Sequence, residues 1–253
     1  MTEQWQCFSI WFQLIFFVAI EIYRKRPTIG STGRREARRP YGEAHWRRWL
    51  PWALAAKRIM IYKTIEKLVA AISRGQIEIY NEFSLQHELG ILLRSEFPSD
   101  KVQFERNISY FVNSAEFIKK EIDISIFSPD KSQLRCAVEI KFPRNGQYPE
   151  QMFHFCKDIL FAEQLKRAGF KRSFLIIFAD DPLFYSGNGD GIYGYVRQGK
   201  TLCGAIGKPT GKKDETIRLK GTYQVNWTGI SGALKYTIIE ANNGQQINQP
   251  HRE

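Results

Sequence analysis

From Met60 onward, apolar residues recur at helical spacing in two segments. "MIYKTIEKLVAAISRG" places them three and four positions apart, which predicts a helix over about 61–74 that ends near Gly75. Leucines recur in the same way over about 83–96, where Pro98 ends a second predicted helix. The chain beyond Met60 is therefore expected to begin with two amphipathic helices.

The pattern then changes to the alternation of β-strands. Residues 102–111 read as a strand, and residues 120–127 alternate isoleucine with polar side chains. The turn-forming cluster "SPDKSQ" at 128–133 separates that segment from a further strand at 134–142. The sequence therefore predicts a β-hairpin over 120–142.

A third helix and a buried strand follow the hairpin. Pro149 suits the first position of this helix, and Gly169 is a suitable stop. "SFLIIFAD" at 173–180 is apolar throughout, as in strands that are buried on both faces. Four further strand-like pieces are divided by glycine-rich turns: "GIYGYVR" (191–197), "TLCGAI" (201–206), "ETIRLKGTYQVNW" (215–227) and "LKYTIIE" (234–240).

The element order from residue 83 is α-β-β-β-α-β, followed by a β-rich extension. This order indicates an α/β fold with a mixed sheet. We expect one domain over 60–242 and a disordered polar tail over 243–253.

The first 59 residues have a different character. They hold five of the six tryptophans and are rich in arginine. Their apolar stretch, 8–23, contains Gln13 and Glu21 and is shorter than the roughly 20 residues that span a bilayer. We therefore interpret 1–59 as an over-extended reading frame or a dispensable leader. The alternative is a membrane anchor, which "RKR" at 24–26 would orient with its carboxyl end inside.

Composition and charge narrow the function classes only slightly. The 253 residues are 43% hydrophobic and 25% charged, as in ordinary globular proteins. The net charge is +11, but residues 1–59 contribute +7 of it, so charge alone does not indicate a nucleic-acid partner for 60–242. The four cysteines lack the spacing of a zinc site and suit free thiols in a reducing cytoplasm. We expect a cytoplasmic protein without a membrane partner.

Two charges interrupt the strand at 134–142, because Glu139 and Lys141 alternate with apolar neighbours. Burying either charge unpaired would cost several kcal/mol, on the order expected for desolvated ions. One interpretation is an ion pair on a solvent-exposed edge strand, worth about 0–1 kcal/mol. The other is a site that needs charge. Asp123 lies on the polar side of the preceding strand, where the turn brings it toward Glu139, and Glu88 lies on the apolar stripe of its helix.

Three carboxylates and a lysine at one place favour metal-assisted chemistry. Mg²⁺ prefers oxygen ligands and usually takes one or two protein carboxylates, with water and phosphate completing the shell. A metal beside a phosphodiester polarises the phosphoryl oxygen and lowers the pKa of bound water. A nearby lysine orients that water or offsets developing charge. The combination suits phosphodiester hydrolysis.

Asp123, fifteen intervening residues, and then Glu139-Ile140-Lys141 resemble the D-x(n)-(D/E)-x-K core of the PD-(D/E)XK nuclease superfamily. The element order is also similar to that of the restriction-endonuclease-like core, over about 83–180. The resemblance implies that Asp123 and Glu139 bind Mg²⁺ or Mn²⁺ and that Lys141 assists the attacking water. It further implies that the Ile140 carbonyl and Glu88 are metal ligands. The proline that often precedes the aspartate is replaced by Glu121-Ile122.

Residues 144–151 link the lysine strand to the next helix, where such nucleases often contact substrate. Arg144 and Gln147 are candidates for phosphate binding, and Gln151 for a side chain directed at the site. The alternative is an ordinary turn with a helix start, since Asn145-Gly146 is a good turn by itself.

The resulting hypothesis is a metal-dependent nuclease of the restriction, defence or repair type that acts on DNA. The main alternative is a catalytically inactive member of the same fold, which binds nucleic acid or serves as a subunit of a larger complex. A second alternative is an interaction protein whose carboxylates merely pair with lysines. A homodimer would supply two sites for cutting both strands.

Overall fold

The computed structural model describes residues 50–112, 117–144, 146–211 and 214–242, and the side chains of α2 from Met60 onward. The elements are α2 (Leu50–Ser73), α3 (Glu82–Glu96), β1 (Lys101–Asn107), β2 (Glu121–Phe127), β3 (Leu134–Lys141), α4 (Tyr148–Arg167), β4 (Arg172–Ala179), α5 (Ile192–Arg197), β5 (Leu202–Gly207), β6 (Thr216–Tyr223), β7 (Thr228–Ser231) and β8 (Leu234–Glu240).

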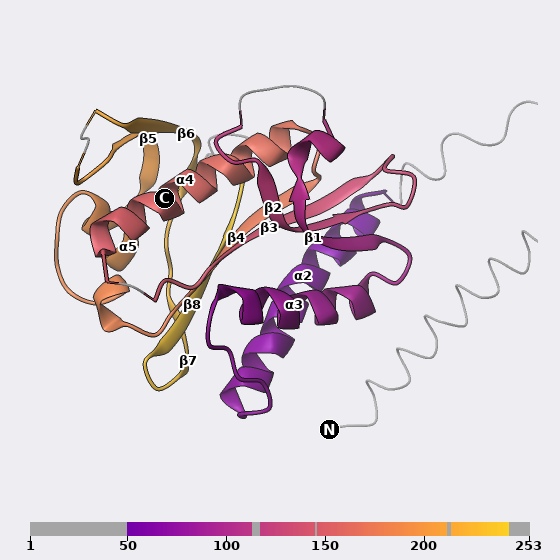
Figure 1. The fold of residues 1–253 in the computed structure, drawn as a ribbon, viewed down its shortest axis with the longest axis horizontal. Coiled ribbons are helices and arrows are strands. Elements are labelled where there is room, and N and C mark those ends of the chain that lie inside the picture. The colour runs from indigo at the N-terminus through magenta and orange to yellow at the C-terminus, as the bar shows by residue number, and fades with distance from the viewer. Residues whose placement is uncertain (1–49, 113–116, 145, 212–213, 243–253) are drawn as a thin grey trace, which may run out of the picture. The chain divides into compact units, whose positions relative to one another are not determined.

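A six-stranded mixed sheet in the order β1-β2-β3-β4-β8-β7 forms the centre of the fold. Its only parallel pair within the described residues is β3 with β4, which α4 connects. Helices α2 and α3 cover one face, while α4, α5 and the β5–β6 hairpin lie on the other (Figure 1). The structure is therefore a mixed α/β fold with an open sheet.

Strand alternation assigns the side chains of β3 to these two faces. Val138 and Ile140 pack in the core beneath α2 and α3, whereas Ala137 packs on the α4 side. Because successive side chains point to opposite faces, Glu139 and Lys141 belong to the α4 side. The parallel β3–β4 pair also brings the carboxyl ends of both strands to one edge of the sheet.

Most predicted elements are present in the structure. The hairpin over 120–142 is confirmed as the antiparallel pair β2–β3, and the segments at 83–96, 149–169 and 173–180 correspond to α3, α4 and β4. Strand β1 ends at Asn107, and a short 3-10 helix over 108–110 follows.

One predicted strand is wrong, since residues 191–197 form the helix α5. Its buried residues Ile192 and Val196 are four positions apart, a spacing that fits one face of a helix as well as one face of a strand. Helix α2 begins at Leu50, so it crosses the expected domain boundary at Met60.

The apolar stretch 8–23, most of the leader and the tail 243–253 lie outside the described residues. In the part of the chain that the structure does describe, no helix is long and apolar enough to cross a bilayer.

Candidate active site

Strands β2 and β3 separate where the candidate site begins. Their paired register runs up to Ile124 opposite Val138. One residue further, the Asp123 carboxylate accepts a hydrogen bond of 2.6 Å from the backbone N–H of Ile140. The side chain thus takes the place of the main-chain partner that the separated strand no longer offers. The backbone N–H of Asp123 lies 3.4 Å from Glu139 Oε1, so the two acids lie next to each other.

Glu139 is fully buried, with 0% of its surface exposed. Its carboxylate pairs with Lys119, which lies just before β2. The same Lys119 ammonium lies 3.1 Å from Oδ1 of Asp158, a buried residue of α4. Lys119 therefore links the strand acid to a helix acid.

Lys141 does not pair with Glu139. Its Nζ donates to Glu82 Oε1 at 3.0 Å and to the Ile140 carbonyl at 2.8 Å. Asp158 Oδ2 lies 4.0 Å from it. The two charges that interrupt β3 thus have different partners, and the interpretation of a simple Glu139–Lys141 ion pair does not describe the structure.

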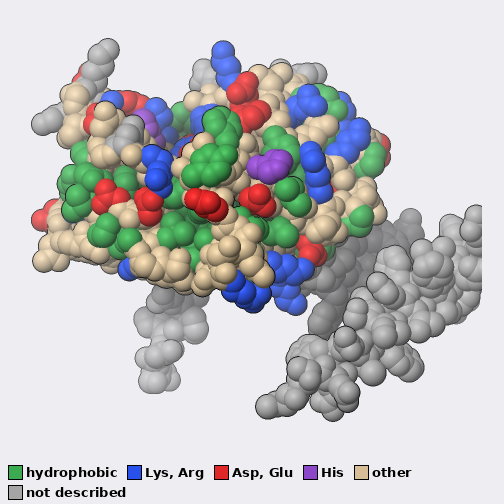
Figure 2. Space-filling model, turned by 60° about the horizontal axis from the view of Figure 1, so that its bottom comes forward, with side chains coloured by type: hydrophobic (Ala, Val, Ile, Leu, Met, Phe, Trp, Pro, Cys, Tyr) green, Lys and Arg blue, Asp and Glu red, His purple; other side chains and the backbone are tan. Residues whose placement is uncertain are grey.

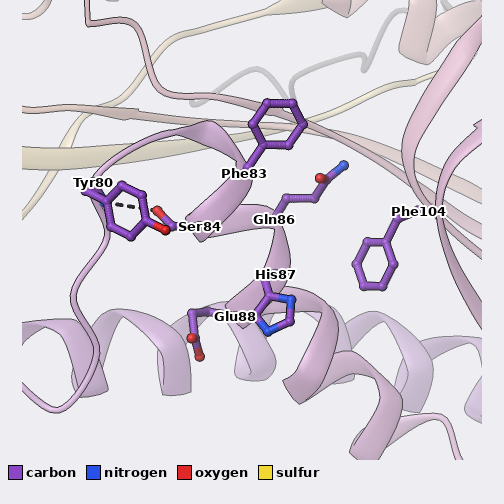
Figure 3. A pocket seen from close by; sticks show the side chains of 7 residues that line it. All are labelled: Tyr80, Phe83, Ser84, Gln86, His87, Glu88 and Phe104. Carbon is purple, nitrogen blue, oxygen red and sulfur yellow. Dashed lines mark hydrogen bonds between the residues drawn. The ribbon is translucent and has the colours of Figure 1, made fainter.

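Glu88 lies elsewhere than expected. It lines a pocket on the outside of α3 together with Tyr80, Phe83 and Phe104 (Figure 3). Glu82 of the same helix contacts the site instead, through Lys141 and the backbone N–H of Phe142. Six residues at 3.6 per turn rotate Glu88 about 120° away from Glu82, which explains why the two acids serve different surfaces.

Gln86 is a further contribution of α3 to the site. It lies four positions after Glu82, on the same side of the helix. Its side-chain amide donates to the backbone carbonyl of Asp123 at 2.8 Å and to Glu105 at 2.6 Å. Helix α3 is thereby fixed to the strand that carries Asp123.

The predicted substrate contacts lie beyond the end of β3. Arg144 is ion-paired with Asp180 after β4, and its guanidinium lies 4.9 Å from the centre of the Phe142 ring. Gln147 is exposed and has a left-handed backbone at the N-cap of α4, while Gln151 is half-buried one turn later. The structure thus places these residues after the carboxyl end of β3, and Arg144 already has an acidic partner.

Burial and neighbouring charges shift the pKa values of the ionisable side chains in the site. Burial raises the pKa of Asp123 to about 6, against the lowering effect of Lys141 and Lys119. Burial, and then the neighbouring Asp123, raise the pKa of Glu139 well above its usual range. For Lys141, burial lowers the pKa, but Asp158 and Glu82 outweigh it, so the pKa is raised. Lys141 is therefore a charged side chain at neutral pH.

The donor set suits a hard divalent cation. Asp123, Glu139 and the Ile140 carbonyl supply oxygen atoms at one place, which matches the one or two carboxylates that Mg²⁺ usually takes from a protein. No group of three or more metal-binding side chains occurs among the described residues, so water and substrate would complete the shell. Oδ2 of Asp158 is buried without a hydrogen bond. Four carboxyl groups, including Glu82, face only two lysines here, and a bound cation would favour the ionised forms of Asp123 and Glu139, whose pKa values are raised without it.

The sequence-based prediction missed four residues of the site, namely Lys119, Asp158, Glu82 and Gln86. Asp158 had a detectable signal, because it lies three residues after Phe155 and four before Ala162, within the apolar stripe of α4. Glu82 opens a helix, where an acid is ordinary, and Lys119 lies outside any periodic segment.

No protein-family model, curated protein or solved structure matches this chain. The resemblance to PD-(D/E)XK nucleases therefore rests on the residues and the element order described above.

Proposed function

We propose that this protein is a metal-dependent nuclease that hydrolyses phosphodiester bonds in DNA. The observation that carries the proposal is the separation of β2 from β3, at which Asp123, Glu139 and Lys141 gather beside an excess of buried carboxylates. A stable fold rarely buries unbalanced acids without a ligand or a chemical use for them.

In this proposal, Asp123, Glu139 and the Ile140 carbonyl hold Mg²⁺ or Mn²⁺, while Asp158 contributes charge from α4. The bound metal would polarise the phosphoryl group and lower the pKa of a coordinated water. Ile140 N–H fixes the orientation of the Asp123 carboxylate, and Lys119 fixes that of Glu139. Glu88 is not in this set, because it faces a separate pocket.

Lys141 acts in this proposal as a fixed positive charge. In the metal-free protein Asp158 and Glu82 raise its pKa, which favours the charged ammonium. The ammonium donates to Glu82 and to the Ile140 carbonyl, which holds it beside the proposed ligands. From there it can orient a water molecule and stabilise the negative charge that develops on phosphate oxygens.

The direct test incubates the full chain with supercoiled plasmid and with single-stranded and branched DNA, in Mg²⁺ or in EDTA. We expect Mg²⁺-dependent cleavage that Lys141→Ala and Glu139→Gln abolish. Glu163→Gln is the matched control, because it also alters a buried acid, but one outside the site. Equal inactivity of the wild type and of both site variants on every substrate would refute the proposal.

One observation favours a second candidate, a nuclease-fold protein that binds nucleic acid without cutting it. Glu139 has no exposed surface and pairs with Lys119, as an acid with a permanent counter-ion would. Metal binding separates the candidates. A nuclease gains thermal stability from Mg²⁺ in a Glu139-dependent way, whereas the binding protein binds DNA with no such gain.

A further inference from the structure

A recess on α3 lies next to the proposed active site. It has a volume of about 420 Å³, within the range of about 300–1,000 Å³ typical of small-ligand sites. Its lining consists of Tyr80, Phe83, Ser84, Gln86, His87, Glu88 and Phe104 (Figure 3). None of the site functions described above uses the aromatic residues, His87 or Glu88.

Two aromatic rings at this pocket are unusually exposed. Tyr80 is 66% and Phe83 70% accessible, although burying a ring of this size normally contributes favourable free energy. Figure 2 shows a face of the molecule on which hydrophobic side chains lie exposed among acidic, basic and histidine side chains. Exposed apolar surface with polar groups around it is typical of a binding site.

The third ring forms a fixed wall. Phe104 rests against the backbone of α3 at Gly90, where an added Cβ would lie 2.1 Å from the ring. The Arg94 guanidinium lies 4.9 Å from the centre of the same ring. Phe104 thus depends on the glycine for its position, and it faces Gln86 and His87 across the recess (Figure 3).

The charges of the lining select the kind of ligand. The lining holds one carboxylate, Glu88, and no Lys or Arg, although Arg94 lies behind the Phe104 ring, so the lining itself favours a neutral group over a phosphate. A flat, neutral ring with N–H donors fits better, because it can stack on an aromatic side chain and donate to a carboxylate. Nucleobases that carry an amino group have both properties.

The pocket adjoins the proposed active site through Gln86. That side chain lines the pocket and also donates to the backbone carbonyl of Asp123 at 2.8 Å. A nucleotide bound with its phosphate near Lys141 therefore has this recess within reach.

We propose that the α3 pocket binds an unpaired, amino-bearing nucleobase of the nucleic-acid substrate. The base stacks on the exposed rings of Tyr80 and Phe83 and directs its amino edge toward Glu88. This inference rests on the proposed function, because the substrate class comes from it. It adds that the preferred substrate has a single-stranded segment beside the bond to be cut.

The test uses the full chain carrying Lys141→Ala, so that the substrate is not consumed, in Mg²⁺. The probes are a blunt duplex and the same duplex with a short single-stranded extension of cytosine or of thymine. Stacking of one base contributes about 1–3 kcal/mol, which corresponds to roughly 5- to 150-fold in affinity. We expect the cytosine extension to bind about tenfold more tightly than the blunt duplex in fluorescence anisotropy, and the thymine extension less tightly than cytosine.

Phe83→Ala and Tyr80→Ala should remove most of the advantage of the extension. Ile91→Ala should not, because Ile91 is also exposed on α3, at 47%, but lies outside the lining. Glu88→Gln should reduce the preference for cytosine over thymine. A fluorescent purine analogue in the extension should be quenched on binding, and Phe83→Ala should relieve that quenching.

The outcomes of this test distinguish the pocket inference from the nuclease proposal. If blunt and extended duplexes bind equally and the wild type cuts both, the pocket inference is overturned while the nuclease stands. If the analogue is quenched in a Phe83-dependent way but the wild type never cuts, the pocket stands and the enzyme proposal falls. If no probe binds the variant, the pocket inference is overturned, and cleavage by the wild type alone decides the nuclease proposal.

Discussion

Helix α4 carries two buried acids five residues apart, and they lie in opposite electrostatic environments. Glu163 accepts hydrogen bonds from the backbone N–H groups of Lys220 at 3.0 Å and Gly221 at 2.7 Å, and from the Tyr223 hydroxyl at 2.8 Å. Asp158 shares Lys119 with Glu139, and its Oδ2 has no hydrogen bond.

The difference separates an acid that supports the fold from an acid that belongs to the proposed site. The hydrogen-bond donors to Glu163 come from β6, while Arg167 of α4 itself lies 3.6 Å from its Oε2, so this carboxylate fastens the β5–β6 hairpin to α4. Around Asp158 the neighbours include two further acids, and the positive charge is shared. Burial by itself therefore does not distinguish the two acids, whereas the incomplete compensation of Asp158 is what places it with the proposed site.

The largest expected effect is on activity, and it compares Glu139, which shares Lys119 with Asp158, with Glu163. Glu139→Gln should reduce Mg²⁺-dependent cleavage by about 100-fold or more, as loss of a preorganised electrostatic group does. Glu163→Gln should leave the activity of the folded protein within a few-fold. Initial rates on plasmid, corrected for the folded fraction by circular dichroism, give the comparison. Equal losses in both variants would remove the distinction.

The next effect concerns metal and stability. With free Mg²⁺ at 100 times its dissociation constant, the wild type should gain about 2.7 kcal/mol of unfolding free energy. Glu163→Gln should gain the same amount, because its donors lie on the hairpin, and Glu139→Gln should gain little. Thermal melts over a Mg²⁺ titration measure this, with EDTA as the reference. A full gain in Glu139→Gln would place the metal elsewhere.

The third effect is structural. Glu163→Gln replaces charge-assisted hydrogen bonds and turns an amide N–H₂ toward backbone donors, which should cost about 1–3 kcal/mol in the absence of metal. Urea unfolding followed by circular dichroism measures the loss. Glu215→Gln is the control, because Glu215 pairs with Lys157 near the surface and its removal should leave the midpoint unchanged. A stable Glu163→Gln variant would show that the hairpin is held by apolar packing alone.

The smallest effect is a pH dependence of stability in metal-free protein. Because burial raises the pKa of Asp123 to about 6, the folded state binds a proton more tightly than the unfolded state. The contribution of Asp123 is therefore fully present below its unfolded pKa and is lost as pH rises through about 6. Relative to Asp123→Asn, the wild type should become more stable between pH 7 and pH 5, as measured by melts in EDTA. Parallel curves for the two proteins would contradict the assignment.

The sequence predicted the strands well where alternation was strict. The alternating isoleucines of β2 fit only a strand, and the short length of the mostly apolar β4 favoured a strand over a helix, so their elements and the β2–β3 pairing could be read directly. Residues 191–197 were misread because a spacing of four residues suits both a helix and a strand.

The residues of the candidate site were likewise predicted correctly only in part. Asp123, Glu139 and Lys141 stand out because they interrupt apolar strands, and the structure brings them together. Glu88 was predicted to face the site because it lies on the apolar stripe of its helix, yet it lines the α3 pocket. Periodicity gives the angle of a residue around a helix, but not how the helix is rotated against the sheet.

By itself, the sequence determined the local structure and the charged interruptions of β3, because both follow from the spacing of residues along one segment. Only the tertiary structure decided which acids meet. Glu82, Lys119 and Asp158 come from three separate segments, and their positions depend on how α3 and α4 pack across the sheet. It also decided that Glu163 is satisfied and Asp158 is not, because hydrogen-bond partners from β6 reach only one of them.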